Sequence, residues 1–132
     1  MKLKEALSWL ENHQPLPNDK ELTQEIADTY DLIRKYFMHR SDKKCIPLFL
    51  NSFGDRDGWG MYQLIEDALC LFSAQDVLPY LQESLQSHNP YVRQWSAYIA
   101  SDFPSSSLIS PLCKLLADED YDVKAAAIIA LK

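Results

Sequence analysis

The sequence lacks the long apolar segments that would place it in a membrane. No stretch approaches the roughly 18 consecutive apolar residues that a membrane-spanning helix needs. The opening residues 1–13 are too polar for a signal peptide, because their longest apolar run is two residues. We therefore expect a cytoplasmic protein that makes no contact with a membrane.

Cysteine and glycine are both scarce, with three of each. Cys45, Cys70 and Cys113 lie far apart and form no CxxC pair. In a reducing compartment this pattern predicts buried free thiols rather than disulfides or a redox site. All three glycines lie within residues 54–60, so we expect the backbone to be unusual in that loop.

Positive charge is scarce in the second part of the chain. Residues 1–56 carry nine basic and nine acidic side chains, whereas residues 57–132 carry four and ten, and the net charge is −6. Binding of nucleic acid depends on Lys and Arg that neutralise phosphates, so we expect no nucleic-acid partner. A basic protein partner suits the acidic part better, and the alternative is a surface that only promotes solubility.

Patterns typical of catalytic or metal sites are also missing. His13, His39 and His88 have neither HxxxH nor HExxH spacing. The serines at 105–107 lack a GxSxG motif and stand where a helix needs an N-cap. We therefore expect a protein that is not an enzyme, with no catalytic residues, no metal and no cofactor.

Helical periodicity covers most of the chain, and no segment has the pattern of a strand. The first helix is expected over residues 2–13, and two prolines end it. The longest helix is expected over residues 20–39, capped by Asp19. Its core-facing stripe comprises Leu22, Ile26, Thr29, Ile33 and Phe37. Shorter helices follow at about 44–53, 59–72, 76–87, 90–102, 106–117 and 121–131.

The later helices repeat. Pro47, Pro79 and Pro111 are spaced by 32 residues, each expected in the first turn of a helix, where a missing N–H costs nothing. Met61, Val92 and Val123 are spaced by 31 and mark the second helix of each pair. A period of 31–32 residues that contains two short helices predicts a helical solenoid, in which each hairpin buries its apolar face against its neighbours.

The segments "HNPYVRQWSAYIA" and "EDYDVKAAAIIAL" carry a Val-Arg/Lys step followed by small residues. At these residues the chain resembles the HEAT-like repeat family, in the short bacterial form found in phycobilin lyases. The resemblance implies an all-α fold, an α-solenoid of about three helical hairpins over 44–132. Residues 1–43 would form an N-terminal helical cap in the same single domain, 1–132. Met61-Tyr62 and His88-Asn89 depart from the repeat pattern, so no regular Asp–Arg ladder is predicted.

In HEAT-type solenoids the second helices line the concave face, which the resemblance therefore makes the candidate binding surface. The buried positions of these helices should be Met61, Ile65 and Leu69, then Val92, Ser96 and Ile99. Aromatic and acidic residues off this stripe are predicted to bind the partner, because amphipathic rings form hot spots. They are Asp57, Trp59, Tyr62, Glu66, Tyr91, Trp95, Tyr98 and Asp102. The alternative is that the rings fill space between repeats.

Small, acidic, all-helical proteins with degenerate HEAT-like repeats resemble bacterial immunity proteins. That resemblance implies a basic toxin domain, such as a nuclease, as the partner. An adaptor or regulatory scaffold is the alternative within the binding class, and a phycobilin-lyase-like or DNA-glycosylase-like enzyme is the alternative outside it. The apolar Ile128, Ile129 and Leu131 of the last helix also predict a possible homodimer through that helix, or its inclusion in the partner interface.

Overall fold

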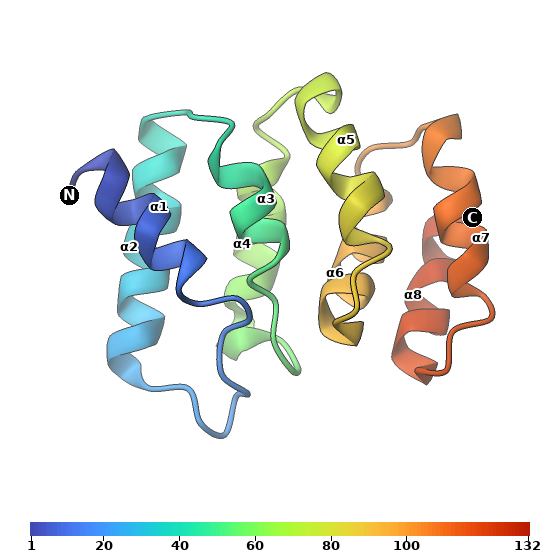
Figure 1. The fold of residues 1–132 in the computed structure, drawn as a ribbon, viewed down its shortest axis with the longest axis horizontal. Helices are drawn as coiled ribbons and strands as arrows, with labels where there is room; N and C mark the ends of the chain where they lie inside the picture. Colours follow the sequence, from blue (N-terminus) through green and yellow to red (C-terminus); the bar gives the residue numbers. More distant parts are fainter. The chain divides into compact units, whose positions relative to one another are not determined.

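The computed structural model describes all 132 residues as eight α-helices, two single-turn 3-10 helices and no strand (Figure 1). This confirms the predicted all-α architecture of short helical hairpins. The residues pack into two compact units, 1–72 and 73–132. Each unit has its own buried apolar residues, and the expectation of a single domain stays a prediction.

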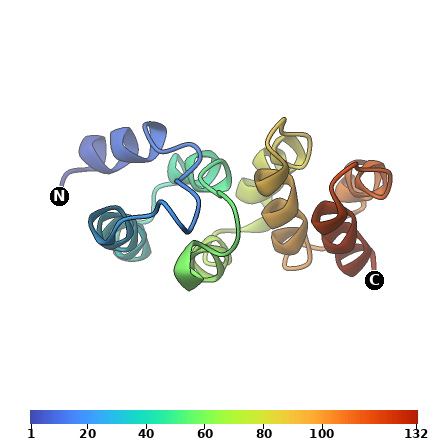
Figure 2. The same ribbon diagram turned by 90° about the horizontal axis from the view of Figure 1, so that it is seen from below.

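The first unit contains the two longest connections and the least regular backbone. Its elements are α1 (Leu3–Glu11), α2 (Gln24–His39), α3 (Cys45–Leu50), η1 (Gly58–Gly60) and α4 (Met61–Leu69). Helix α1 packs against α3 and α2 against α4. Within this unit α1 and α3 therefore form one layer, and α2 and α4 form the other (Figure 2). The residues predicted to be a cap thus share a core with the first repeat, and their capping role stays a prediction.

The second unit is a pair of hairpins of nearly equal length. Its elements are α5 (Ala74–Ser84), α6 (Pro90–Ala100), η2 (Ser106–Leu108), α7 (Ile109–Leu115) and α8 (Tyr121–Leu131). Helix α6 packs against α5 and along α8, and α7 packs against α8. Side-chain oxygens cap α5, α6, η2 and α8 by accepting backbone N–H bonds, and they belong to Ser73, Asn89, Ser105 and Asp120 respectively. The capping role predicted for the serines at 105–107 is therefore confirmed at Ser105.

The predicted start of α2 was wrong. The helix begins at Gln24, and Thr23 is its N-cap, with its hydroxyl accepting the N–H of Ile26 at 3.2 Å. Asp19 lies outside the helix and bonds a different segment. The buried stripe is also shifted, because Ile26 and Thr29 are only half-buried. Its members are Ala27, Tyr30, Ile33 and Phe37.

One of the three repeated prolines does not occupy the expected position. Pro47 and Pro111 are each the third residue of a helix, inside the first turn. Pro79 is the sixth residue of α5, which begins at Ala74. The 32-residue spacing therefore does not mark equivalent positions throughout. Burial follows a 31-residue period, since Val77 and Leu81 correspond to the buried Leu108 and Leu112.

The first unit is packed around aromatic rings. Tyr30, Phe37, Phe49, Phe53 and Tyr62 are all buried. The rings meet edge to face, with centroids 5.1 Å apart for Phe53 and Tyr62 and 6.3 Å apart for Tyr30 and Tyr62. The hydroxyl of Tyr30 forms a 2.6 Å hydrogen bond with the buried Ser52. Large rings joined by specific polar contacts therefore fill the space between α2, α3 and α4.

The second unit is packed around small side chains. Fully or almost fully buried residues of α6 and α8 include Ser96, Ala97, Ala100, Ala126 and Ala127. The hydroxyl of Ser96 donates to that of Ser84 at 2.7 Å, and Ser84 donates to the carbonyl of Leu81 at 3.2 Å. Small residues allow helices to approach closely, and both buried hydroxyls have a hydrogen-bond partner.

Candidate functional site

The loop before α4 holds Trp59 in an unusual backbone conformation. Arg56, Gly58, Trp59 and Gly60 have φ values of 67°, 57°, 56° and 87°. The N–H of Gly58 donates to the carboxylate of Asp19 at 3.0 Å, and the indole N–H of Trp59 donates to the carbonyl of Asp19 at 3.1 Å. The unusual backbone confirms what the clustered glycines predicted, and the two hydrogen bonds fix the loop to the connection between α1 and α2.

Position 58 requires glycine for two reasons, its positive φ and its close contact with the ring of Tyr62. A Cβ atom there would lie 2.6 Å from Cε1 of the Tyr62 ring. The close approach lets the loop cover the ring, so Tyr62 is fully buried. Any side chain at position 58 would separate the loop from the core.

The prediction that Tyr62 is a partner-binding residue was wrong. Its hydroxyl accepts the N–H of Gly54 at 2.8 Å, and its ring packs against Tyr30 and Phe53. Burial raises the pKa of Tyr62 well above its usual range, although the hydrogen bond from Gly54 lowers it. Tyr62 is a core residue because the preceding loop folds over it, which helical spacing alone does not reveal.

Two predicted acidic residues lie on this unit. Asp57 is exposed, and Glu66 is half-buried on α4. Burial and a hydrogen bond with Asp57 raise the pKa of Asp19 from its usual value. Asp19 and Asp57 therefore form a close carboxyl pair beside the indole of Trp59, and the pair makes this part of the surface negative.

A groove of about 300 Å³ lies beside Trp59. Its walls come from α2, η1 and α4, and they comprise Gln24, Ala27, Asp28, Asp31, Trp59, Met61 and Leu64. Trp59 and Leu64 are 47% and 40% exposed. Asp31 already bonds Arg34 and Lys35 at 2.8 and 3.1 Å, whereas Asp28 is exposed and bonds the amide of Gln24. Asp28 and Leu64 were not predicted, although both fall off the buried stripes of their helices.

The other four predicted residues lie on α6 or directly after it. Tyr91, Trp95 and Tyr98 recur at helical spacing and are each half-buried, and Asp102 is exposed. Trp95 and Tyr98 meet edge to face with centroids 5.3 Å apart, and the amide of Gln94 donates to the hydroxyl of Tyr98 at 3.3 Å. Part of each ring packs within the unit and part remains accessible, so their binding role stays a prediction.

The Val-Arg step of α6 has a structural role. Arg93 donates from Nε and Nη2 to the two carboxylate oxygens of Asp118, at 2.8 and 3.1 Å, and from Nη1 to the carbonyl of Ser87. Although burial opposes it, these hydrogen bonds lower the pKa of Asp118. This fork joins one hairpin to the turn of the next. It is a single Arg–Asp pair, and the absence of a regular Asp–Arg ladder stays a prediction.

The HEAT-repeat family matches residues 40–132. The chain belongs to this family. HEAT repeats are helical scaffolds for protein interaction and are in general not catalytic. No curated protein and no solved structure matches the chain.

The remaining chemistry of this HEAT-repeat protein concerns its thiols. Cys45 is buried, and burial together with the nearby Asp42 raises its pKa to about 12. Cys70 and Cys113 are exposed, so the prediction of three buried thiols holds for Cys45 alone. No three His, Cys, Asp or Glu residues are placed to share a metal ion. None of the eight helices has both the length and the apolar character needed to cross a membrane.

Proposed function

We propose that this HEAT-repeat protein is a non-catalytic binding module for a basic protein, and that the partner is a bacterial toxin domain of the nuclease class that it neutralises as an immunity protein. Membership of the HEAT-repeat family supports a protein partner. The net charge of −6 supports a basic one, because opposite charge speeds encounter and orients the two proteins. Acidic residues exceed basic ones in both units, by twelve to nine and by seven to four.

Trp59 is the observation that carries the proposal. A left-handed backbone costs an ordinary residue about 1–2 kcal/mol, yet here it holds an indole that is almost half exposed. Residues held in such conformations concentrate at functional sites. Because the bond to Asp19 fixes the ring, a partner would meet an aromatic surface that loses little conformational entropy on binding.

The groove beside Trp59 has the chemistry to take an arginine or lysine side chain. A cation can lie over an indole face and bond a carboxylate at the same time, and Asp28 supplies an exposed carboxylate on the groove wall. Met61 and Leu64 offer apolar surface for the methylene groups of such a side chain. The occupant is therefore a basic residue of the partner.

The test compares the wild-type chain with Trp59→Gly. Glycine adopts a φ near 56° without strain, so the variant should stay folded while the ring is lost. Proteins of the native host that bind the immobilised chain are identified by mass spectrometry, and the purified partner is used to measure Kd and inhibition of nuclease activity. We expect a basic partner whose Kd rises at least about tenfold with Trp59→Gly, the range of an interface hot spot.

Tyr121→Ala is the matched control, because Tyr121 is an aromatic residue that is 80% exposed in the other unit. Its Kd should equal that of the wild type. A partner bound equally well by Trp59→Gly would refute the site, and an acidic partner would refute the charge argument. A basic partner whose activity is unchanged by binding would refute the immunity role but retain the binding module.

A further inference from the structure

The two ends of α2 carry opposite charge. Residues 18–28, around the start of the helix, hold four acidic side chains and one basic, whereas residues 35–44, at its end and in the connection to α3, hold four basic and one acidic. This connection lies at the opposite end of the first unit from the loop that carries Trp59 (Figure 1). A helix of this length spans roughly 24 Å, and charges are screened over about 8 Å at physiological salt, so a partner meets the two ends as separate surfaces.

The positive charge at the end of α2 has few partners within the chain. Lys35 pairs with a carboxylate of its own helix at 3.1 Å, but Arg40, Lys43 and Lys44 form no ion pair. The one acidic residue of this end, Asp42, accepts the backbone N–H of Lys44 at 3.0 Å. Arg40, Lys43 and Lys44 are all exposed, so three cations are available to bind an anion.

The guanidinium of Arg40 is positioned by an aromatic ring. Its Cζ lies 5.7 Å from the centroid of the Tyr36 ring, within the range of a cation–π contact. The Tyr36 ring itself meets the buried Phe37 edge to face, with centroids 5.1 Å apart. The guanidinium forms no hydrogen bond within the chain, and its planar fork can bond both oxygens of a carboxylate.

A groove of about 310 Å³ lies beside Arg40. Its walls comprise Met1, Leu32, Lys35, Tyr36, His39 and Arg40. Leu32, Tyr36 and Arg40 follow one another at four-residue spacing and therefore share one face of the helix. Leu32 is 55% exposed, so the groove offers apolar surface next to cations.

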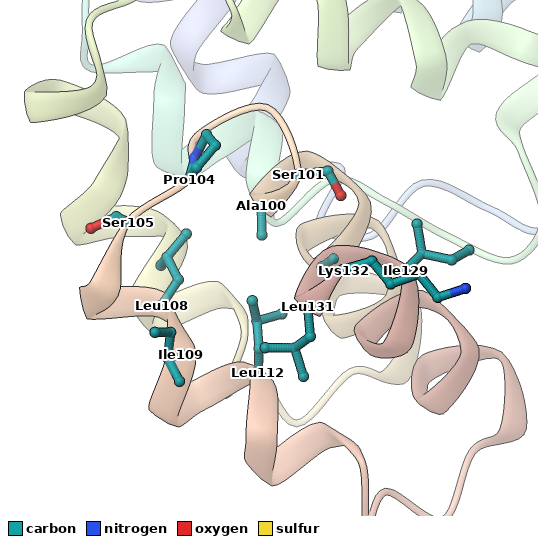
Figure 3. A pocket seen from close by; sticks show the side chains of 11 residues that line it. Ala100, Ser101, Pro104, Ser105, Leu108, Ile109, Leu112, Ile129, Leu131 and Lys132 are labelled. Carbon is teal, nitrogen blue, oxygen red and sulfur yellow. The ribbon is translucent and has the colours of Figure 1, made fainter.

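The apolar groove of the second unit has different chemistry. It lies between α6, α7 and α8 and has a volume of about 380 Å³ (Figure 3). Lys132 is the only charged residue that lines it. Charge therefore selects an occupant for the groove beside Arg40 but not for the groove of the second unit.

We propose that the groove beside Arg40 binds an acidic segment of a protein, in which an aspartate or glutamate accepts from the guanidinium of Arg40 and a neighbouring aliphatic side chain covers Leu32. Lys43 and Lys44 attract the other carboxylates of the segment. The observations favour a protein segment over a nucleic acid or an anionic membrane, because a long anionic surface would also meet the acidic end of the same unit. The groove does not include Trp59 and takes the opposite charge, so this proposal and the proposed function can fail separately.

The probe is a fluorescein-labelled peptide of repeated Glu-Glu-Leu triplets, and its binding to the full chain is followed by fluorescence anisotropy. We expect saturable binding that weakens at least about tenfold with Arg40→Gln, the effect of losing a hydrogen bond between charged groups. Arg40→Lys should weaken binding less, because the charge stays while the planar fork is lost. Arg40 is exposed, so both variants should keep the helical circular dichroism spectrum of the wild type.

Lys20→Gln is the matched control, because Lys20 is an exposed cation at the acidic end of the same unit. The variant loses the same charge and should bind the peptide as tightly as the wild type. The proposal is overturned if the peptide does not saturate the wild-type chain, or if Lys20→Gln weakens binding as much as Arg40→Gln. It is also overturned if a peptide with Gln in place of Glu binds equally well. Tighter binding of a single-stranded oligonucleotide or of phosphatidylserine vesicles, lost with Arg40→Gln, would overturn it too, because the occupant would then be a nucleic acid or a membrane.

Discussion

The two units solve the same packing problem with different side chains. The first fills its core with five large rings, and a loop with four left-handed residues closes over one of them. The second brings its helices together through alanine and serine and joins its hairpins with the Arg93–Asp118 pair. In the second unit the small side chains let the helices pack closely, and this close packing fits a regular arrangement of hairpins. Rings that fill a larger space permit the irregular backbone that presents Trp59.

The comparison also separates charges that hold the fold from charges that stay available. In the second unit Arg93 and Asp118 satisfy each other and are largely buried, with 19% and 10% of their side chains exposed. In the first unit Asp19 lies beside Asp57, and burial together with that pairing raises the pKa of Asp19. The Arg93–Asp118 pair thus uses its charges within the repeats, whereas the irregular loop leaves negative charge beside an exposed ring.

The largest expected effect breaks the first unit alone. Tyr62→Ala removes a buried ring from the aromatic core and should cost about 3–5 kcal/mol of unfolding free energy, as large-to-small core changes do. Urea unfolding of the wild type and the variant measures this loss of unfolding free energy. The alkylation rate of the buried Cys45 should rise in the variant, since that thiol lies in the same unit.

Tyr62→Phe is the matched control for this core. It keeps the ring and removes only the hydroxyl that accepts from Gly54, so it should cost about 1–3 kcal/mol through one unpaired buried N–H. A Tyr62→Ala protein as stable as the wild type would mean that the ring is not part of the core, as the sequence had predicted.

The next effect tests the second unit. Asp118→Ala leaves Arg93 without its bidentate partner and should cost about 2–3 kcal/mol, the range for hydrogen bonds to charged groups. Because the pKa of Asp118 is lowered by folding, its stabilisation is present above the unfolded pKa near 3.9 and is lost as pH falls through the folded value. Urea unfolding at pH 7 and at pH 3 measures the difference in unfolding free energy between the wild type and Asp118→Asn. The difference should be smaller at pH 3. An equal difference at both pH values would contradict the charged pair.

These two contrasts show what the sequence could and could not predict about the fold. Helical periodicity and the 31-residue period predicted the hairpins and the buried positions Ile65, Val92 and Ser96, since both depend on local spacing. The start of α2 was misplaced because Asp19 and Thr23 are both acceptable caps, and the choice between them depends on Gly58, which is distant in the sequence.

The candidate site could be predicted only in part, for a related reason. The glycine cluster next to Trp59 indicated the irregular loop, because glycines are needed where the backbone adopts positive φ. The burial of Tyr62 and the groove wall at Asp28 depend on contacts between α2, the loop and α4. The Arg93–Asp118 fork spans 25 residues, and only the Val-Arg step signalled it.

A smaller effect sharpens the role of small residues in the second unit. Ser84→Ala removes the acceptor of the buried Ser96 hydroxyl and should cost about 1–2 kcal/mol, the penalty for an unpaired buried group. Ser96→Ala should cost less than about 1 kcal/mol, because Ser84 still donates to the carbonyl of Leu81. Thermal unfolding of both variants shows which of them loses more stability. The reverse order would show that the hydroxyl pair is bonded in the opposite direction.

The smallest effect concerns the carboxyl pair beside Trp59. Folding raises the pKa of Asp19, so the folded state binds more protons than the unfolded state between the two pKa values, and stability falls as pH rises through that window. Asp19→Asn retains an oxygen that can accept the N–H of Gly58, and its amide can donate to Asp57 without repulsion. The variant should therefore be more stable than the wild type at pH 7, by less than about 1 kcal/mol because Asp19 is only half-buried and Asp57 is exposed. The gain should vanish near pH 3, where the wild-type carboxyl is protonated. Urea unfolding at both pH values measures it, and a variant that is less stable at pH 7 would mean that the negative pair does not oppose folding of the loop.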